Sequence, residues 1–172
     1  LHVLDLRERF RQEVVDEFAS EYLRGRTPNP CIVCNRRIKF GALLEWALEQ
    51  GADYVATGHY ARRKYDAGRY QLWRGADPGK DQSYVLYTLG QRELAHSLFP
   101  LGAYTKEQVR ALAREGGLPA AAQPESQDVC FIPDNNYRRF LKAHCPGAMA
   151  PGPICDSSGN LVGRHKGLAY HT

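Results

Sequence analysis

The chain has 172 residues, of which 43% are apolar and 24% are charged, and its formal net charge is +4. This composition is typical of a soluble globular protein with one ordinary domain or somewhat more. No apolar run approaches the roughly 20 residues of a membrane-spanning helix, and the first five residues do not resemble a signal peptide. We therefore expect neither a membrane-spanning nor a secreted protein but a cytoplasmic one.

Two helices and a stiff loop are predicted at the start of the chain. Apolar side chains at every fourth position predict an amphipathic helix over residues 6–23. Pro28 and Pro30 predict a non-helical loop up to Cys31, because each proline fixes its own φ and restricts the residue before it. A second helical pattern covers residues 36–50, and a glycine follows each of the two helices as a stop signal.

A β-rich run follows the second helix. Residues 53–57 predict a short buried strand, and Gly58 and His59 come directly after it. Residues 59–74 alternate between polar and apolar side chains around a turn and predict a hairpin. A helix, a strand and a glycine at the strand's carboxyl end form an α/β pattern, and ligands bind at such strand ends.

The second half of the chain is predicted to be mostly helical before it changes character. Residues 80–83 open a short helix that runs to Tyr87, and Thr105 with Gln108 forms a capping box for the next helix. The other expectations are an irregular segment over 119–133, a helix over 134–144 capped by Asp134, and turn-rich β structure from Pro146 onward. The abrupt start and the unfinished pattern at residues 170–172 lead us to expect that both ends are truncated.

The basic residues are concentrated in the first third of the chain. Such a concentration suits a phosphate backbone, although an ordinary solvated surface explains it equally well. The residues are Arg24, Arg26, Arg36, Arg37, Lys39, Arg62, Arg63 and Lys64.

The cysteines indicate thiol chemistry and not a disulfide framework. Their number is odd and their spacing uneven, which fits a reduced compartment with reactive or metal-binding thiols. Cys31 and Cys34 form a Cys-x-x-Cys motif, which suits half a zinc site, a redox pair or part of an iron–sulfur site. The remaining cysteines are Cys130, Cys145 and Cys155, and we expect the last two to be bystanders.

Cys34 is the stronger candidate for a reactive thiol within that motif. It lies two residues before the helix predicted to start at residue 36, where the helix dipole stabilises a thiolate. Arg36 and Arg37 add positive charge nearby. The alternative is a buried, inert cysteine.

Cys130 follows a polar run that predicts an exposed loop, and Phe131 and Ile132 are expected to anchor that loop. A thiol on such a loop suits persulfide chemistry, with a second thiol that resolves it as a disulfide. Spacing alone supports this weakly, because 96 residues separate Cys34 from Cys130.

Two further motifs have both a structural and a functional interpretation. Gly58 and His59 fit a turn after a strand, or a nucleotide or nucleic-acid contact. Lys80, Asp81 and Gln82 fit a helix N-terminus, or donors to phosphates and base edges.

Five sequence blocks in order resemble the tRNA-specific 2-thiouridylase family, also called the MnmA/TrmU family. Together they cover nearly the whole chain. The blocks are Thr27–Asn35 with Ile38–Phe40, Ala56–Arg62, Lys80–Tyr84, Glu125–Ile132 and Gly163–Leu168.

The resemblance implies an ATP-dependent sulfurtransferase that thiolates C2 of uridine 34 at the tRNA wobble position through an adenylated intermediate. It implies that Cys130 carries the persulfide sulfur. Cys34 would be the nucleophile that frees this sulfur and closes a disulfide with Cys130. ATP and Mg²⁺ are the implied cofactors, because magnesium offsets phosphate charge.

The resemblance also implies binding residues and partners. Gly58 matches a position that contacts ATP, and its missing side chain would allow close approach. The implied partners are tRNAs with Lys, Glu and Gln anticodons and a sulfur-carrier protein or cysteine desulfurase, with no membrane. The target base would be contacted by Asn29, Pro30 and Cys31, and the tRNA by His59, Lys80, Asp81 and Gln82.

The implied fold is α/β. Residues 1–95 would form the C-terminal part of a HUP-like (adenine nucleotide alpha hydrolase-like) parallel-sheet domain with an ATP and tRNA site. Residues 96–147 would form a small, mostly helical central domain with the catalytic cysteine loop, and residues 148–172 the start of a β-barrel.

The chain departs from the family in three respects, one of which is that we expect most of the C-terminal barrel to be missing from it. The N-terminal Ser-Gly-Gly-x-Asp-Ser loop that cradles ATP phosphates does not occur in it, so we expect these 172 residues to be inactive alone. Cys31 stands where some members carry Asp. Cys31, Cys34 and Cys130 together also fit an iron–sulfur cluster held by three thiolates.

Two other functions remain open from the sequence. One is a non-catalytic module that binds tRNA or a metal (zinc or an iron–sulfur cluster). The other is an ATPase of the same phosphate-loop type with a different acceptor.

Overall fold

The computed structural model of the chain describes residues 1–122 and 129–171 and divides into two compact units. The first unit comprises residues 1–4 and 31–125, and the second comprises residues 5–30 and 126–172. Each unit has its own hydrophobic core. The division into three domains at residues 95 and 147 stays a prediction.

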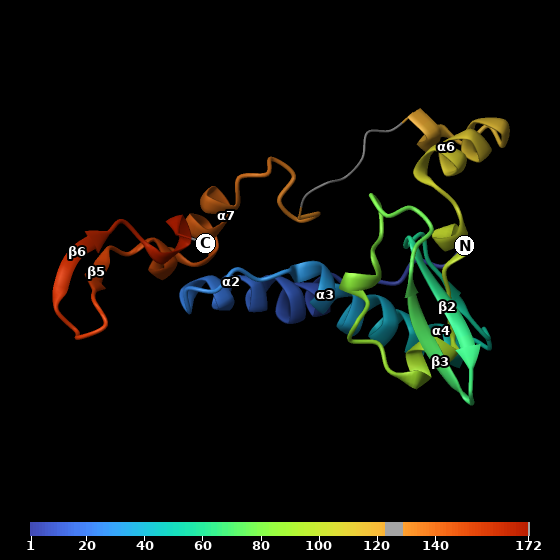
Figure 1. Ribbon diagram of the computed structural model, residues 1–172, viewed down its shortest axis with the longest axis horizontal. Helices are drawn as coiled ribbons and strands as arrows, with labels where there is room; N and C mark the ends of the chain where they lie inside the picture. Colours follow the sequence, from blue (N-terminus) through green and yellow to red (C-terminus); the bar gives the residue numbers. More distant parts are fainter. Residues whose placement is uncertain (123–128, 172) are drawn as a thin grey trace. The chain divides into compact units, whose positions relative to one another are not determined.

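A long helix opens the second unit, as the spacing of apolar residues predicts. It is built from α1 (Arg7–Phe10), the π-helical segment η1 (Arg11–Val15) and α2 (Asp16–Leu23) (Figure 1). Its buried face includes Phe18 and Tyr22. The predicted stop is confirmed, because Gly25 adopts a φ of 70°, which glycine reaches at little cost.

The rest of the second unit packs on that helix. The core cluster joins Phe18 and Tyr22 with Ile132, Leu141 and Ala169. In sequence order the elements are α7 (Tyr137–His144), η6 (Pro146–Met149), β5 (Gly152–Cys155), β6 (Leu161–His165) and η7 (Leu168–Tyr170). The antiparallel pair of β5 and β6 confirms the turn-rich β structure expected after Pro146.

The predicted cap of α7 is wrong. Asn136, and not Asp134, is the N-cap residue, and its side chain accepts a hydrogen bond of 3.0 Å from the backbone N–H of Arg139. Asp134 instead accepts from the N–H of Asn136 and forms an ion pair of 2.8 Å with Arg139. Both residue types suit an N-cap, and the turn before α7 selects the one nearer the helix.

The second helical run begins earlier than predicted. It starts with α3 (Pro30–Cys34) and continues through the π-helical segment η2 (Asn35–Leu43) and α4 (Leu44–Glu49). The expected start at residue 36 is therefore wrong. The physical reason is that proline is well suited to the first position of a helix, where its missing N–H costs nothing.

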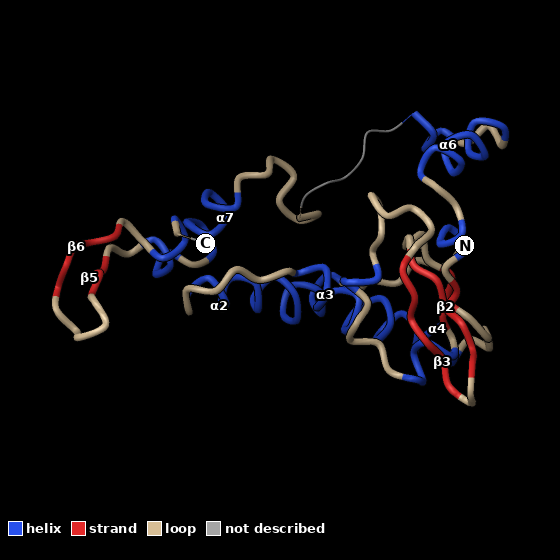
Figure 2. Tube along the Cα trace, in the orientation of Figure 1, coloured by secondary structure: helices blue, strands red, loops and turns tan. Residues whose placement is uncertain are grey.

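The first unit contains a parallel strand pair and a hairpin. β1 (Val55–Ala56) pairs in parallel with β4 (Ser97–Leu98), and β2 (Ala61–Asp66) pairs with β3 (Arg69–Arg74) in antiparallel register. Figure 2 shows the hairpin as the longest strands of this unit. Its two-residue turn has positive φ at Ala67 (48°) and Gly68 (78°), which is typical of the tight turns that join twisted strands.

Short helices complete the first unit. The short helix expected to open at residues 80–83 and run to Tyr87 is only the 3-10 turn η3 (Ser83–Val85). The capping box of Thr105 and Gln108 is confirmed at the start of α6 (Lys106–Glu115). The other elements are α5 (Gln91–Ala95), η4 (Pro100–Ala103) and η5 (Pro119–Ala122).

The core of the first unit lies between the helical run and the hairpin. It combines Phe40, Ala61, Leu86 and Phe99, with further side chains around them. Gly102 makes this packing close, because a Cβ there would lie 1.7 Å from the backbone oxygen of Ala61. Within residues 1–122 and 129–171, no helix has the length and apolar character needed to cross a membrane.

Candidate functional site

The two cysteines of the Cys-x-x-Cys motif lie in the helical run. Cys31 is in its first turn and is exposed, whereas Cys34 lies one turn later and is half-buried. Residues three apart share one helix face, so both thiols point to the same side. Because the macrodipole acts mainly on the first turn, the thiolate-stabilising position predicted for Cys34 belongs to Cys31.

Asn35 fixes the helical run next to Cys34. Only 2% of its surface is exposed, and its Nδ2 donates a hydrogen bond of 3.1 Å to the backbone oxygen of Val85. Its Oδ1 is buried and has no partner among the described residues. From the sequence, no role is predicted for Asn35, which lies directly before the helix predicted to start at residue 36.

The strand end at Gly58 is open. Gly58 is exposed, and a Cβ added to it would lie 3.6 Å from the nearest atom, a side-chain carbon of Leu101. A ligand can therefore approach the backbone here. This geometry suits the ATP contact expected at Gly58, which stays a prediction.

His59 is buried beside that strand end. It shares a hydrogen bond of 2.8 Å between its Nδ1 and the hydroxyl of Thr57, and its ring lies near Phe40 and Phe99. Burial, with the charge of Lys39, lowers the pKa of His59 to about 4. The ring is therefore neutral at pH 7 and helps to shape the strand end, while its expected tRNA contact is untested.

Gln82 and Asp81 hold the segments around the strand end together. The N–H of Tyr60 donates 3.0 Å to the side chain of Gln82, and the N–H of Gln82 donates 2.9 Å to the backbone oxygen of Tyr60. Asp81 accepts from the N–H of Gly75 at 2.9 Å and from the hydroxyl of Ser83 at 2.8 Å.

The charge of Asp81 follows from those hydrogen bonds. Burial opposes its ionisation, but the donors from Gly75 and Ser83, with Arg74 nearby, lower its pKa overall. Both oxygens of the carboxylate thus accept hydrogen bonds within the protein. Lys80, which precedes it, is half-buried, and tRNA contacts by Lys80, Asp81 and Gln82 stay predictions.

The basic residues of the first third of the chain are divided between the two units. Arg24 and Arg26 form ion pairs with Glu21 in the second unit. Arg63 donates to the backbone oxygens of Leu94 and Ala95 at 2.8 and 2.7 Å and so caps α5. Arg36 and Arg37 are exposed on η2 and have no ion pair within the part of the chain that the structure describes.

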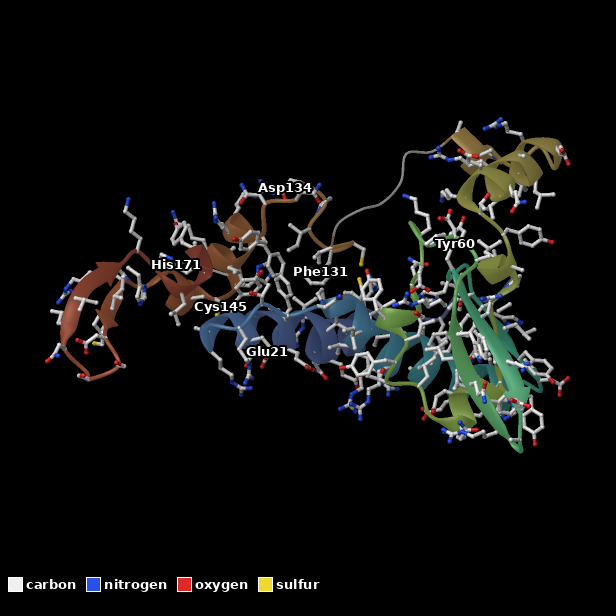
Figure 3. All side chains as sticks on the ribbon, viewed as in Figure 1. Glu21, Tyr60, Phe131, Asp134, Cys145 and His171 are labelled. Atoms are coloured by element: carbon white, nitrogen blue, oxygen red, sulfur yellow. The ribbon has the colours of Figure 1, made fainter. Side chains whose placement is uncertain are left out.

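Cys130 is exposed, and the residues after it are anchored as predicted. Ile132 is 2% exposed in the core of the second unit. The ring of Phe131 lies 5.8 Å from that of Phe10 in α1 and 5.4 Å from that of Phe18 in α2. Figure 3 labels Phe131 beside the helix that these elements form. The Glu125–Asp128 part of the sequence block that precedes Cys130 lies outside the described residues.

A small pocket of the second unit adjoins the Cys130 segment. It has a volume of about 140 Å³, close to that of a cavity known to hold a single six-membered ring of about 150 Å³. Tyr22 and Tyr137 stack at 5.5 Å in its wall. It is lined by Phe18, Tyr22, Pro28, Val129, Ile132, Asn135 and Tyr137.

This pocket brings together two segments that are distant in the sequence. Pro28 lies in the loop that leads into Asn29, Pro30 and Cys31, and Val129 directly precedes Cys130. Cys34 belongs to the first unit and Cys130 to the second. The iron–sulfur alternative gains no support, since the described residues contain no group of three or more His, Cys, Asp or Glu side chains placed to hold a metal.

The two remaining cysteines, Cys145 and Cys155, both belong to the second unit. Cys145 is buried in the core of the second unit, where its Sγ donates 3.7 Å to the backbone oxygen of Ala19. Cys155 is exposed at the end of β5. That both are bystanders stays a prediction.

Helices beside a parallel strand pair, with an open glycine at the strand's carboxyl end, are typical of the α/β class of domain, and comparison with known proteins agrees. Residues 1–134 match the model of the tRNA methyl transferase HUP domain family. The chain belongs to this family. The match confirms the expected HUP-type α/β fold.

Known proteins of similar sequence are tRNA-specific 2-thiouridylases called MnmA. Those of Moorella thermoacetica and Carboxydothermus hydrogenoformans are 54% and 57% identical over 99% of this chain. That of Chloroflexus aurantiacus is 52% identical over the same share. The chain covers 48%, 47% and 48% of these relatives and so spans about half their length.

Proposed function

We propose that the protein is an ATP-dependent tRNA sulfurtransferase that replaces the C2 oxygen of uridine 34 with sulfur. The names of its relatives support this proposal. The structural observation that supports it most is that Pro28, from the loop before the Cys-x-x-Cys motif, and Val129, which directly precedes Cys130, line the same pocket.

The pocket suits the target base. Its volume of about 140 Å³ and its aromatic wall fit one pyrimidine ring and not a whole nucleotide. The uridine must leave its stack to enter, and unpaired anticodon bases do so at low cost. Asn29, Pro30 and Cys31 continue the chain from Pro28 and would contact this base.

ATP supplies the leaving group for the oxygen, since adenylation of O2 turns a poor leaving group into AMP. Gly58 would lie against ATP, which its exposed, side-chain-free backbone permits. His59, Lys80, Asp81 and Gln82 would contact the tRNA around this strand end. Mg²⁺ bound with ATP would offset phosphate charge, and we assign it no ligand in this chain.

The two thiols would perform the sulfur transfer. The terminal sulfur of a persulfide on Cys130 attacks C2 and expels AMP, which leaves C2 joined to Cys130 through a disulfide. The thiolate of Cys34 then attacks Sγ of Cys130, breaks that S–S bond and forms the Cys34–Cys130 disulfide. The transferred sulfur takes the electron pair and becomes the thiocarbonyl of 2-thiouridine, and an external thiol reduces the disulfide.

The proposed partners are those that the resemblance to the 2-thiouridylases implies. We propose tRNAs with Lys, Glu and Gln anticodons as substrates, a sulfur-carrier protein or cysteine desulfurase as the sulfur source, and the cytoplasm as the location. Cys31 would contact the base, and an iron–sulfur cluster is not part of the proposal.

The test uses the complete gene product with tRNA, ATP and a sulfur source, and measures 2-thiouridine by mass spectrometry. The variants Cys34→Ser and Cys130→Ser are compared with Cys155→Ser, which changes another exposed thiol. We expect product from wild type and Cys155→Ser and none from the other two. Product from both Cys34→Ser and Cys130→Ser would refute the mechanism.

A further inference from the structure

The β2–β3 hairpin has one face in the core and one face in solvent. Ala61, Tyr70 and Leu72 belong to or pack on the core of the first unit. The antiparallel register places three cross-strand pairs on the opposite face, because side chains alternate along a strand. These pairs are Arg62 with Trp73, Lys64 with Gln71, and Asp66 with Arg69, and we call them the outer hairpin face.

An exposed indole is held in a fixed orientation on the outer hairpin face. Trp73 remains 46% exposed, although its Nε1 donates a hydrogen bond of 2.8 Å to the side chain of Gln71. The ammonium of Lys64 lies 5.5 Å from the centre of the Trp73 ring. The hydrogen bond to Gln71 restrains the orientation of the ring, yet much of its apolar surface remains accessible to a ligand.

The outer hairpin face also has a surplus of positive charge. Arg62, Lys64 and Arg69 face one carboxylate, Asp66, and the Lys64–Asp66 pair is long at 3.8 Å. The Nε of Arg62 donates a hydrogen bond of 2.8 Å to the backbone oxygen of Arg74. Within residues 1–122 and 129–171, Arg62 and Arg69 form no ion pair, so their guanidinium charge is not neutralised locally.

The arginines of the helical run of α1, η1 and α2 differ in this respect. Each has a carboxylate partner close in sequence, as for Arg9 with Glu13 at 3.0 Å and Arg11 with Glu8 at 2.6 Å. Such ion-paired cations are typical of an ordinary solvent-exposed surface. Un-neutralised cations beside an exposed aromatic ring are instead the combination that binds single-stranded nucleic acid, through phosphates and base stacking.

We propose that the outer hairpin face binds a single-stranded segment of RNA, with Lys64 and Arg69 on phosphates and a base stacked on Trp73. β2 begins three residues after Gly58, and Asp81 and Gln82 bond to the residues at the base of the hairpin. RNA on this face would thus continue from the strand end. That the RNA is tRNA rests on the proposed function.

Binding of an unmodified tRNA transcript to the complete gene product tests this proposal. The double variant Lys64→Gln/Arg69→Gln removes two phosphate contacts and should reduce the slope of log K against log salt by about 2. Trp73→Ala should raise Kd by about five-fold or more, whereas Trp73→Phe keeps a stacking ring and should raise it less. Arg92→Gln, an exposed cation on α5, is the matched control and should change neither quantity.

The outcomes separate the two proposals. If wild type binds tRNA and the double variant has the Kd and salt slope of Arg92→Gln, the hairpin proposal is wrong and the proposed function stands. If wild type does not bind tRNA, both are wrong. Circular dichroism checks that each variant is folded, and the glutamine variants at exposed positions keep the test valid even where Trp73→Ala unfolds.

Discussion

The two thiol-bearing segments are held in different ways. Cys34 lies within a continuous helical run, and Asn35 ties that run to the backbone of Val85 through a buried hydrogen bond. Cys130 is exposed in a turn, and its neighbours Val129, Phe131 and Ile132 all pack on or belong to the core of the second unit. The helix holds Cys34 through its backbone, whereas the turn of Cys130 is held by the side chains of its neighbours.

The difference is consistent with the two chemical roles that we propose. A sulfur carrier must receive sulfur from one partner and deliver it to another, which an exposed thiol in a turn allows. A resolving nucleophile acts at one place, which suits a helix position. The following predictions test how much each anchor contributes.

The largest effect is expected at the anchor of Cys130. Ile132→Ala removes a side chain that is 2% exposed and should lower the free energy of unfolding by about 2–5 kcal/mol. Urea unfolding measures this. Val162→Ala, which shortens a side chain that is 63% exposed, is the control, and an equal effect of both changes would show that Ile132 does not anchor the segment.

A pH-dependent effect is expected at the strand end of the first unit. The pKa of His59 is lowered to about 4 in the folded protein, against about 6.5 in an unfolded chain. The unfolded state therefore binds more protons between these values, and stability is lost as pH falls from about 6.5 towards 4. We expect a loss of about 2–3 kcal/mol from this residue across that window.

Unfolding of wild type and His59→Gln at pH 7 and at pH 4.5 measures this loss. The variant should be less stable at pH 7 and should show a flatter dependence on pH. Equal pH dependence of the two proteins, or an NMR titration of His59 near 6.5, would contradict the buried, neutral ring.

A smaller effect is expected at the anchor of Cys34. Asn35→Ala removes the hydrogen bond to Val85 and leaves a buried carbonyl without this donor, at a cost of about 1–3 kcal/mol. Gln50→Ala, at the exposed end of the helical run, is the control. Unfolding of both variants in urea should show a lower midpoint for Asn35→Ala alone. Equal midpoints would show that Asn35 does not hold the helical run in place.

The smallest effect concerns the rates of the thiols themselves. Cys31 is exposed in the first helical turn, where the macrodipole favours a thiolate, and Cys34 is half-buried a turn later. We expect iodoacetamide to modify Cys31 several-fold faster than Cys34, and the buried Cys145 slowest, as read by peptide mass spectrometry. Faster modification of Cys34 would instead support the sequence-based prediction that the helix dipole stabilises the thiolate of Cys34.

Local features of the fold are predictable from the sequence. The helix near residues 6–23, the hairpin and the capping box of Thr105 each depend on residues close together in the chain, and all three are confirmed. The start of the second helix at Pro30 was missed, because proline reads as a helix breaker although it fits a first turn. The pairing of β1 with β4 joins residues about 40 positions apart, which no local pattern signals.

The candidate site shows the same limit. The motifs single out Cys34, Gly58 and Cys130, but the buried state of His59 and the bonds of Gln82 to Tyr60 depend on tertiary contacts. Asn35 was missed for that reason. The arginines show it as well, because only the structure distinguishes Arg63, which caps α5, from the solvent-facing cations of the outer hairpin face.

The most direct test of the thiol pair is a single turnover of the complete gene product loaded with persulfide, in the absence of reductant. Peptide mass spectrometry then measures the disulfide that has formed, and nucleoside analysis measures 2-thiouridine. The account predicts a Cys34–Cys130 disulfide in an amount equal to the 2-thiouridine produced. Full yield of 2-thiouridine with Cys34 and Cys130 both still reduced, or with a disulfide that excludes one of them, would contradict it.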